Sequence, residues 1–234
     1  MKRIYLMIGM AAFCLAAFFA PAAAQQAAPY EVEYQTAPKY KDFRFAIGGG
    51  YAYRLGEEEK TGNAALDAMN KKLRHGFTVD ADAQYFFKET WGLGLNANFC
   101  SASTSGNNVK FPDLDNAVNY KETQNFIYFG PSFVGRMESE KFMMITNVGF
   151  GPLFFNTDMN FNGQSVTGNK ATLGVNAGIA GEYKLNGKTG VGLKLSYVIG
   201  TIDNLNVEGT NVSMGQEISV SNLMITAFIS FRSW

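Results

Sequence analysis

The chain has 234 residues, of which 47% are hydrophobic and 17% are charged, so a disordered chain is not the default expectation. Lys and Arg number 20, as do Asp and Glu, and this balance excludes a strongly basic nucleic-acid-binding protein. The combination of 25 Gly with 20 Phe and 11 Tyr favours a protein built from β-sheet.

The first 24 residues have the three-part layout of a secretory signal peptide. Lys2 and Arg3 precede an apolar run from Ile4 to Ala20, and three consecutive alanines then supply small residues for cleavage after residue 24. The run is slightly short for a spanning helix and ends at Pro21, which argues against an uncleaved anchor. We therefore expect an exported protein.

Cysteine usage follows from export. Cys14 lies inside the apolar run and would leave with the signal peptide, so Cys100 is the only cysteine of the mature chain. One cysteine cannot form an internal disulfide, so hydrogen bonding and packing must hold the fold. Loss of Lys2 and Arg3 leaves 18 basic against 20 acidic residues, a mature net charge of −2.

The mature chain begins with residues 25–42, which are rich in Gln, Ala, Pro and charge and show no sustained period, and they predict a flexible periplasmic leader. From Phe43 onwards, apolar residues recur at every second position, as in strands. Eight such segments are predicted, and the alternation is least clean in the fourth and fifth, where Tyr128 and Met143 fall among the small or polar positions. The segments are 43–54, 77–88, 91–99, 125–137, 141–155, 171–185, 189–200 and 222–234.

The connections between these segments alternate in length. Those at 88–90, 137–141 and 186–189 are short enough for hairpin turns. Those at 56–76, 101–121, 156–170 and 202–217 are long, polar and rich in Gly, Asn and Asp. Within the first long connection, Ala65, Leu66, Met69 and Leu73 have helical spacing and predict a short amphipathic helix at the rim.

Two kinds of barrel fit eight such strands. A soluble ligand-binding barrel buries its apolar face, whereas a membrane barrel turns that face to lipid. Burying the apolar set would leave an exterior made largely of glycine with scattered charge, including Gly48, Gly92 and Gly174, which is unusual for a soluble protein. The inverted arrangement suits a narrow barrel, whose interior holds small side chains and a few long charged ones.

Aromatic residues support the membrane arrangement, because they gather at both ends of the apolar face. Two aromatic girdles around an aliphatic belt are typical of a bilayer with its two interfaces. Phe43, Tyr85, Phe87, Trp91, Phe142, Tyr183 and Phe231 lie toward the short-turn end, and Tyr51, Tyr53, Phe77, Phe99 and Tyr197 lie toward the long-loop end.

Together, the signal peptide, the eight alternating strands, the unequal connections and the aromatic last strand resemble the OmpA/OmpX/OmpW-type outer-membrane β-barrel proteins of Gram-negative bacteria. The resemblance covers residues 43–234 and rests on architecture, not on a unique motif. It implies an all-β, eight-stranded antiparallel up-and-down transmembrane β-barrel, monomeric, with four long extracellular loops and short periplasmic turns. It also implies contact with outer-membrane lipid and lipopolysaccharide.

In that class, the last strand is a recognition signal for the barrel-assembly machinery. Ile225, Ile229 and Phe231 lie on the apolar face of the last segment, and the final Trp234 is one step out of phase with them. Either Phe231 is the terminal aromatic and the last three residues overhang, or the strand end is bulged.

The interior of such a barrel brings ten charged residues into one narrow space. Their mixed signs favour a paired structural network over an open polar conduit, since an unpaired charge there would cost several kcal/mol. These residues are Arg44, Arg54, Asp80, Asp82, Glu122, Arg136, Glu182, Lys184, Lys194 and Arg232.

No motif fixes a catalytic site. His75 is the only histidine, and no orienting acid or nucleophile accompanies it in sequence, so it is more simply a solvated loop residue. One His and two Cys supply no metal-ligand cluster, and no cofactor is expected. Three functional hypotheses remain: a structural or loop-mediated interaction role in membrane integrity, adhesion or binding of an extracellular ligand; a narrow channel; and, third, a lipid-modifying enzyme.

Overall fold

The computed structural model describes residues 42–56, 63–111 and 116–233. The predicted signal peptide, the predicted leader up to residue 41, and Trp234 lie outside the described residues.

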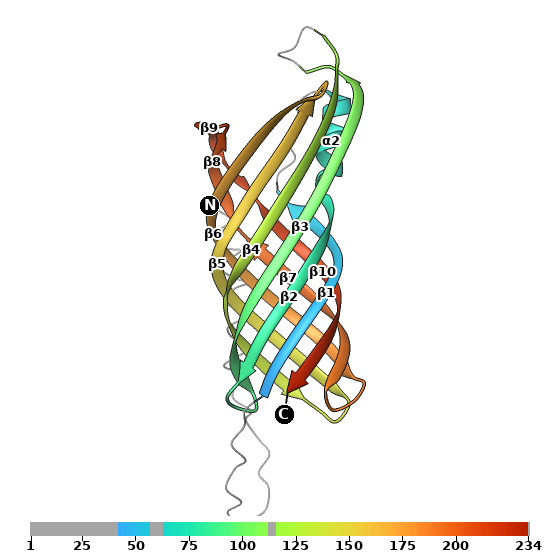
Figure 1. Ribbon diagram of the computed structural model, residues 1–234, viewed down its shortest axis with the longest axis vertical. Helices are drawn as coiled ribbons and strands as arrows, with labels where there is room; N and C mark the ends of the chain where they lie inside the picture. The colour runs from blue at the N-terminus through green and yellow to red at the C-terminus, as the bar shows by residue number, and fades with distance from the viewer. Residues whose placement is uncertain (1–41, 57–62, 112–115, 234) are drawn as a thin grey trace, which may run out of the picture. The chain divides into compact units, whose positions relative to one another are not determined.

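Eight antiparallel strands close into a ring, as the sequence predicts (Figure 1). The ring consists of β1 (Asp42–Leu55), β2 (His75–Phe86), β3 (Trp91–Val109), β4 (Val118–Glu138), β5 (Phe142–Phe161), β6 (Gln164–Lys184), β7 (Thr189–Ile199) and β10 (Ser221–Ser233). Each strand of the ring pairs with the next ring strand along the chain, and the last ring strand, β10, pairs with the first, β1. A row of paired residues followed once around the ring leaves β6 at Ile179 and returns to it at Asn169, ten residues earlier in the sequence. This offset sets the tilt of the strands.

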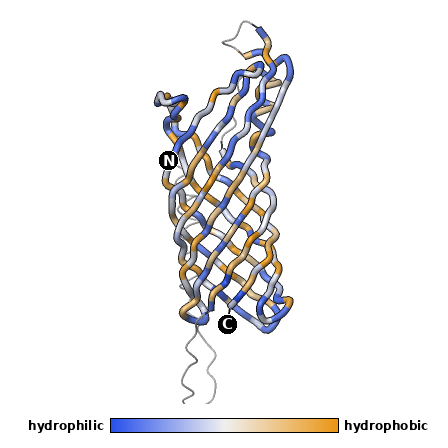
Figure 2. The backbone as a smooth tube through the Cα atoms, in the orientation of Figure 1, coloured by the Kyte–Doolittle hydropathy of each residue, from blue (hydrophilic) through white to orange (hydrophobic). Residues whose placement is uncertain are grey.

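The two faces of the wall follow the two-residue period of the sequence. In β10, Ile225, Ile229 and Phe231 face outward, while Thr226 and Ser230 are fully buried inside. Tyr128 and Met143 both point inward, on β4 and β5. Figure 2 shows apolar residues interleaved with polar ones along the strands of the barrel. A wall that exposes its apolar residues and buries its polar ones is the arrangement of a barrel in a bilayer.

Three of the long connections are more ordered than the sequence analysis predicts, because much of their length continues the strands. β3 and β4 extend together to Val109 and Val118, and β5 and β6 extend to a tight turn at Asn162 and Gly163. These two turn residues have φ values of 51° and 92°, the positive pair that a two-residue hairpin turn requires. The fourth connection forms a further hairpin of β8 (Thr201–Val207) and β9 (Thr210–Ser219), which pairs with β6.

The predicted helix in the first connection is present as α2 (Ala64–Lys72). Asn63 caps it, because its side-chain oxygen accepts a hydrogen bond from the Ala65 amide at 3.0 Å. Leu66 and Met69 are buried against the inward face of the extended strands, together with Val109, Tyr120 and Phe161. The helix therefore packs over the loop end of the interior. No helix among the described residues is long and apolar enough to cross a membrane.

The hydrogen-bonded ladder between β4 and β5 is interrupted in mid-strand. The ladder pairs Tyr128 with Leu153 and Ser132 with Gly149, but not the residues between them. Pro131 on β4 and Pro152 on β5 both lie within this gap, and neither has an N–H to donate to the opposite strand. Two ladder hydrogen bonds are therefore missing at one point of the wall.

Candidate functional site: the filled interior of the barrel

The inward side chains form alternating polar and apolar groups from the short-turn end to the loop end. The lowest group is ionic. Glu182 accepts hydrogen bonds from Arg44 at 2.7 Å and from Arg232 at 2.7 Å, and all three side chains are almost completely buried. Gln84 accepts a further hydrogen bond from Arg44 at 2.9 Å. Two nitrogens of Arg44 donate to one Glu182 oxygen and Arg232 donates to the other, so both oxygens of this buried carboxylate have a cationic donor.

Two more carboxylates complete this lower ionic group. Arg136 donates to Asp42 at 2.6 Å and lies 3.6 Å from Glu138, which also accepts hydrogen bonds from Lys184 at 2.6 Å and Arg232 at 3.2 Å. The composition of residues 25–42 assigns Asp42 to the leader, whereas the structure places it as the first residue of β1, only 2% exposed. The barrel therefore begins one residue earlier than predicted, because this carboxylate has a buried cation to pair with.

An apolar layer follows the lower ionic group. It contains Ala46, Phe86, Val134, Met143, Ile145, Ala180 and Phe228. The guanidinium carbons of Arg136 and Arg44 lie 4.2 Å and 5.3 Å from the ring centroids of Phe86 and Phe228, so the layer meets the ions through cation–π contacts. The interior is therefore not filled only with small and charged residues, as the sequence analysis expects, since large apolar side chains pack there too.

The central group is built on Lys194. Its ammonium nitrogen lies 2.9 Å from both carboxylate oxygens of Asp80 and 2.8 Å from both of Asp82. Asn96 and Asn98 donate hydrogen bonds to Asp82 and Asp80. Two carboxylates against one ammonium leave this buried group with a net charge of −1.

Two further asparagines carry the central group across the interior. Asn147 on β5 donates to Asn96 at 3.3 Å and to Asn176 at 2.8 Å, and Asn176 on β6 donates to Asn98 at 2.9 Å. The network thus links β2, β3, β5, β6 and β7 through side chains alone. Such a bridge ties opposite walls of the barrel together, and each amide in it has a partner.

A second apolar layer closes the interior above the central group. Its members include Cys100, Phe126, Tyr128, Leu153 and Phe155, together with Ala52, Val198, Ile202, Leu205, Val220 and Met224. The cavity among them has a volume of about 10 Å³, room for about one water molecule. The Cys100 thiol is buried within this layer, 3.3 Å from the Met224 sulfur.

The uppermost polar group lies at the loop end. Glu122 accepts hydrogen bonds from Tyr120 at 2.6 Å, from Gln124 at 2.6 Å and from Thr157 at 3.1 Å, and Arg54 donates to Gln124. Burial, with the adjacent Glu122 carboxylate, raises the pKa of Tyr120, so this phenol stays neutral at any ordinary pH. The α2 helix packs beside Tyr120 and covers this group.

The ten charged residues predicted for the interior thus lie in three separate groups, not in one. Arg44, Arg136, Glu182, Lys184 and Arg232 join the lower group, Asp80, Asp82 and Lys194 the central one, and Arg54 and Glu122 the upper one. Asp42, Gln84 and Glu138 also belong to the lower group, although the sequence pattern did not predict them. A spacing rule could have found Gln84, which continues the inward series of Asp80 and Asp82 on β2.

The predicted girdle residues lie on the outer face. Tyr51, Tyr85, Tyr183 and Phe231 are each more than two fifths exposed, and Phe87 meets Trp91 edge to face at 4.2 Å. Tyr53 and Tyr197 are half-buried at the loop-end side. His75 is also outward: its ring contacts those of Tyr51 and Tyr53, with the Tyr53 centroid 5.2 Å away. Trp234, the last residue of the predicted assembly signal, lies outside the described residues.

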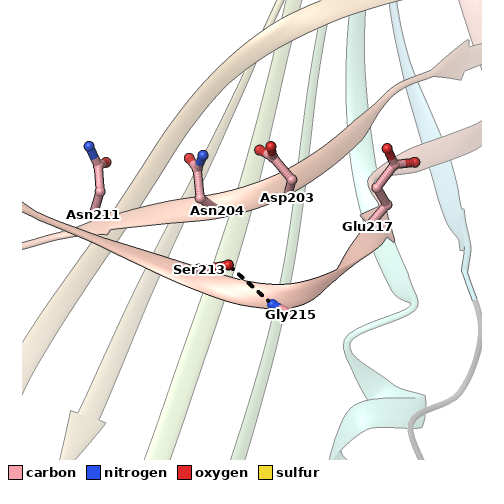
Figure 3. A pocket seen from close by; sticks show the side chains of 6 residues that line it. All are labelled: Asp203, Asn204, Asn211, Ser213, Gly215 and Glu217. Atoms are coloured by element: carbon pink, nitrogen blue, oxygen red, sulfur yellow. Dashed lines mark hydrogen bonds between the residues drawn. The ribbon is translucent and has the colours of Figure 1, made fainter.

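An open depression lies outside the barrel, along the β8–β9 hairpin (Figure 3). It has a volume of about 420 Å³ and is lined by Asp203, Asn204, Asn211, Ser213, Gly215 and Glu217. The Ser213 hydroxyl accepts a hydrogen bond from the Gly215 amide at 3.4 Å. Almost all of the lining is exposed, so the depression offers hydrogen-bonding groups without a preformed enclosure.

Residues 10–217 match the family model described as the outer membrane protein beta-barrel domain. The chain belongs to this family. Membership places the barrel in the outer membrane of a Gram-negative bacterium and accounts for the outward apolar belt. No curated protein matches the chain.

Solved structures share the barrel fold of this family at low sequence identity. A major outer membrane protein from Thermus thermophilus is 10% identical, with a TM-score of 0.54 over 83% of this chain and 100% of that one. Ail, the attachment invasion locus protein of Yersinia pestis, is 15% identical, with a TM-score of 0.48 over 82% and 99%. The outer membrane protease OmpT of Escherichia coli is 9% identical, with a TM-score of 0.46 over 84% and 98%. At these identities the likeness shows the fold alone.

Proposed function

We propose that the protein is a closed outer-membrane barrel whose interior is a structural core and whose loop end carries an interaction role, in adhesion, surface binding or membrane integrity. The observation that carries this proposal is the filled interior. Two apolar layers separate three polar groups, and the cavity in the upper layer has room for about one water molecule. A lumen packed in this way holds the strands that carry the loops in a fixed position. It leaves little space for solutes to pass.

The rest of the chain fits this proposal. We propose that residues 1–24 are removed on export, that the leader lies in the periplasm, and that the barrel-assembly machinery reads the β10 face carrying Ile225, Ile229 and Phe231. The protein is then a monomer without catalytic activity or cofactor. The ring contacts of His75 with Tyr51 and Tyr53 support a role at the membrane interface, not in catalysis.

Single-channel recording in planar bilayers tests the closed interior. The wild-type barrel should show little or no steady conductance. A variant with Phe126→Ala, Leu153→Ala and Phe155→Ala removes three large side chains of the upper apolar layer and should conduct measurably if it stays folded. A wild-type barrel that conducts as steadily as this variant would contradict the proposal.

The matched control removes the same kind of side chain from the outer face. Phe129, Phe133 and Phe154 point outward on the same two strands, so their replacement with alanine should leave conductance unchanged. Boiled and unboiled samples on a gel report folding of each variant, since a closed barrel migrates differently before and after boiling.

A narrow channel is the second candidate, and one observation favours it. The hydroxyls of Ser132, Ser196, Thr226 and Ser230 are buried in the interior and have no hydrogen-bond partner among the described residues. Buried hydroxyls of this kind are usually satisfied by water. Steady wild-type conductance would make these positions the first to examine.

The interaction role is tested separately. Refolded protein is applied to an array of glycans and matrix proteins, alongside a variant in which residues 203–217 are replaced by a short Gly-Ser turn. Binding that the wild type shows and the shortened variant loses supports recognition at the β8–β9 hairpin. Wild-type protein that binds no component of the array would count against adhesion and leave membrane integrity as the role.

A further inference from the structure

The central polar group of the interior carries more negative than positive charge. Among the described residues, Lys194 is the one cation that contacts Asp80 and Asp82, so two carboxylates share a single ammonium. One oxygen of each carboxylate also accepts a hydrogen bond from an asparagine, Asn98 or Asn96. The other two oxygens, Asp80 Oδ1 and Asp82 Oδ2, accept from Lys194 alone within the described part of the chain. Each of them therefore keeps a lone pair for a further partner.

This excess charge lies between two apolar layers. Phe86, Val134 and Phe228 belong to the layer on the short-turn side, and Leu153 and Phe155 belong to the layer on the loop side. A charge that is buried among apolar side chains is costly unless it is paired or neutralised. The central group is therefore expected to hold one further positive charge.

Buried hydroxyls without a partner surround the same group. The side chains of Tyr128, Ser132, Ser196 and Thr226 belong to residues that are 0–4% exposed, and their hydroxyls form no hydrogen bond with any described residue. Buried hydroxyls in proteins are nearly always bonded to protein, to water or to an ion. Four of them around one charged cluster indicate a polar occupant of this part of the interior.

The register places the Thr226 hydroxyl beside the charged cluster. Thr226 on β10 pairs with Lys194 on β7, and both side chains point inward. Only β1 separates Thr226 from Asp80 on β2, and its residues in register with these two are Gly50 and Gly48. The glycines add no side chain to the wall between the Thr226 hydroxyl and the Asp80 carboxylate.

Ser196 adjoins the cluster on its other side. It is the next inward residue after Lys194 on β7, and it pairs with Gly178 on β6. A Cβ atom at Gly178 would lie 2.6 Å from the Asn147 side-chain oxygen and 3.4 Å from Lys194 Cε. The central group therefore packs directly against the backbone that faces Ser196.

The remaining two hydroxyls lie across the barrel, on β4. The Tyr128 hydroxyl lies 2.8 Å from the position of a Cβ at Gly130, which pairs with Asn96 of the central group. The Ser132 hydroxyl lies 3.0 Å from the corresponding position at Gly94, the inward residue next to Asn96 on β3. Tyr128 also lines the cavity of about 10 Å³ in the upper apolar layer. This side of the group therefore has room for about one water molecule.

We propose that the central group binds one monovalent cation of about the size of sodium, held by the Asp80 carboxylate and the Ser196 and Thr226 hydroxyls. Carboxylate and hydroxyl oxygens are hard donors, which suit small hard cations. One positive charge neutralises the group, whereas a divalent ion would leave it with an excess positive charge. Water bound at Tyr128 and Ser132 completes the polar network. The proposal concerns the interior alone and holds whether or not the loop end binds a ligand.

The test compares the stability of the mature chain in sodium chloride and in choline chloride at equal ionic strength. Choline is too large for the packed interior, so it controls for screening. Each sample is refolded in its own salt, and urea unfolding followed by tryptophan fluorescence gives the midpoint. A cation that binds only the folded barrel raises the folded-to-unfolded ratio about tenfold when its concentration is about ten times its dissociation constant. The wild-type midpoint should therefore rise with sodium concentration.

Two variants locate the effect. Asp80→Asn removes the excess charge and should abolish the difference between the two salts. Thr226→Val replaces the hydroxyl with a methyl group of similar shape. Loss of a hydroxyl that is merely buried and unpaired should raise the midpoint in both salts, because its desolvation cost disappears. Loss of a cation ligand should instead lower the midpoint in sodium chloride alone.

Each variant has a matched control. Asp158→Asn changes an exposed carboxylate on the extended part of β5 and should keep the sodium dependence. Thr104→Val removes another buried hydroxyl that has no partner among the described residues, but this one lies on the extended part of β3, in register with Glu122. Its effect should be equal in both salts. Heat modifiability on a gel reports folding, and the two valine variants alone make the test if Asp80→Asn fails to fold.

Three results would overturn the proposal. The first is a wild-type midpoint that is the same in both salts; if it then changes with pH, the added positive charge is a proton. The second is a sodium dependence that Asp80→Asn retains, because the ion would then bind elsewhere. The third is a Thr226→Val midpoint that rises equally in both salts, as expected for a hydroxyl that binds nothing.

Discussion

Replacing Lys194 with methionine should destabilise the barrel by about 3–5 kcal/mol, the usual cost of removing one partner from a buried ion pair. The structure explains the size of the effect. The ammonium touches four carboxylate oxygens at 2.8–2.9 Å, and the Lys194 side chain is only 2% exposed. Methionine has a similar length, so little packing is lost, but two carboxylates remain buried without a cation.

Asp80→Asn should change the stability of the barrel much less than Lys194→Met. The central group of two carboxylates and one ammonium carries one excess negative charge between two apolar layers. Removing that charge leaves one carboxylate, Asp82, for Lys194, and the new amide oxygen can still accept a hydrogen bond. The change in stability should therefore stay within about 1 kcal/mol, in either direction.

Urea unfolding of the refolded barrel, followed by tryptophan fluorescence, measures both variants. For a slope of about 2–3 kcal/mol/M, Lys194→Met should lower the urea midpoint by roughly 1–2.5 M. Lys170→Met is the matched control, because Lys170 pairs at 3.5 Å with the exposed Asp203 and such a pair contributes about 0–1 kcal/mol. A Lys194→Met midpoint equal to that of the control, or an Asp80→Asn cost as large as that of Lys194→Met, would refute the reasoning.

Three further predictions test the wall and its packing. Gly50→Ala should prevent closure of β1 on β10, because the new Cβ would lie 1.9 Å from a backbone oxygen of β10. Gly49→Ala is the control, since a Cβ at this outward-facing position meets nothing closer than 3.5 Å. The heat-modifiable fraction on a gel compares the two variants. Pro131→Ala should raise the urea midpoint by an amount equivalent to about 1 kcal/mol, because alanine has a backbone N–H that can donate a hydrogen bond from β4 to β5. An unchanged or lower midpoint would show that the gap in the β4–β5 ladder does not weaken the barrel. The Cys100 thiol should resist a bulky maleimide in the folded barrel and react within minutes in urea; rapid labelling of the folded form would contradict a packed upper layer.

The sequence was sufficient to predict the ring, because the facing of each strand depends only on a two-residue period. Phe45 and Ile47 point outward and Arg44 and Ala46 inward without any knowledge of neighbouring strands. The same rule resolves Tyr128 and Met143, because each lies in phase with inward neighbours and is buried. Tyr128 has space inside the barrel because Gly130 and Gly174 lie beside it. Local periodicity therefore determines the architecture.

The division of the interior into layers could not be predicted in the same way. Arg44 and Glu182 are 138 residues apart in sequence, and their contact depends on the register of every strand between them. The composition of residues 25–42 could not show that Asp42 belongs to the barrel. Its carboxylate is buried because it pairs with Arg136, which is 94 residues away in the sequence. A turn signal, by contrast, was available: Asn162-Gly163 is the strongest short hairpin pattern, and it accounts for the extended β5–β6 hairpin.

The arrangement of the interior bears on where this barrel can vary. The inward side chains of β4 reach four of the packed groups and layers in turn. Glu122 belongs to the upper polar group and Phe126 and Tyr128 to the upper apolar layer. Val134 belongs to the lower apolar layer and Arg136 to the lower ionic group. A change at any of these positions disturbs contacts made by several other strands, so the interior tolerates little substitution. The outward residues of the extended hairpins carry no such constraint, because neither lipid nor core packs against them. Recognition can therefore change at the loop end without loss of the barrel, provided that the layers beneath keep the wall rigid.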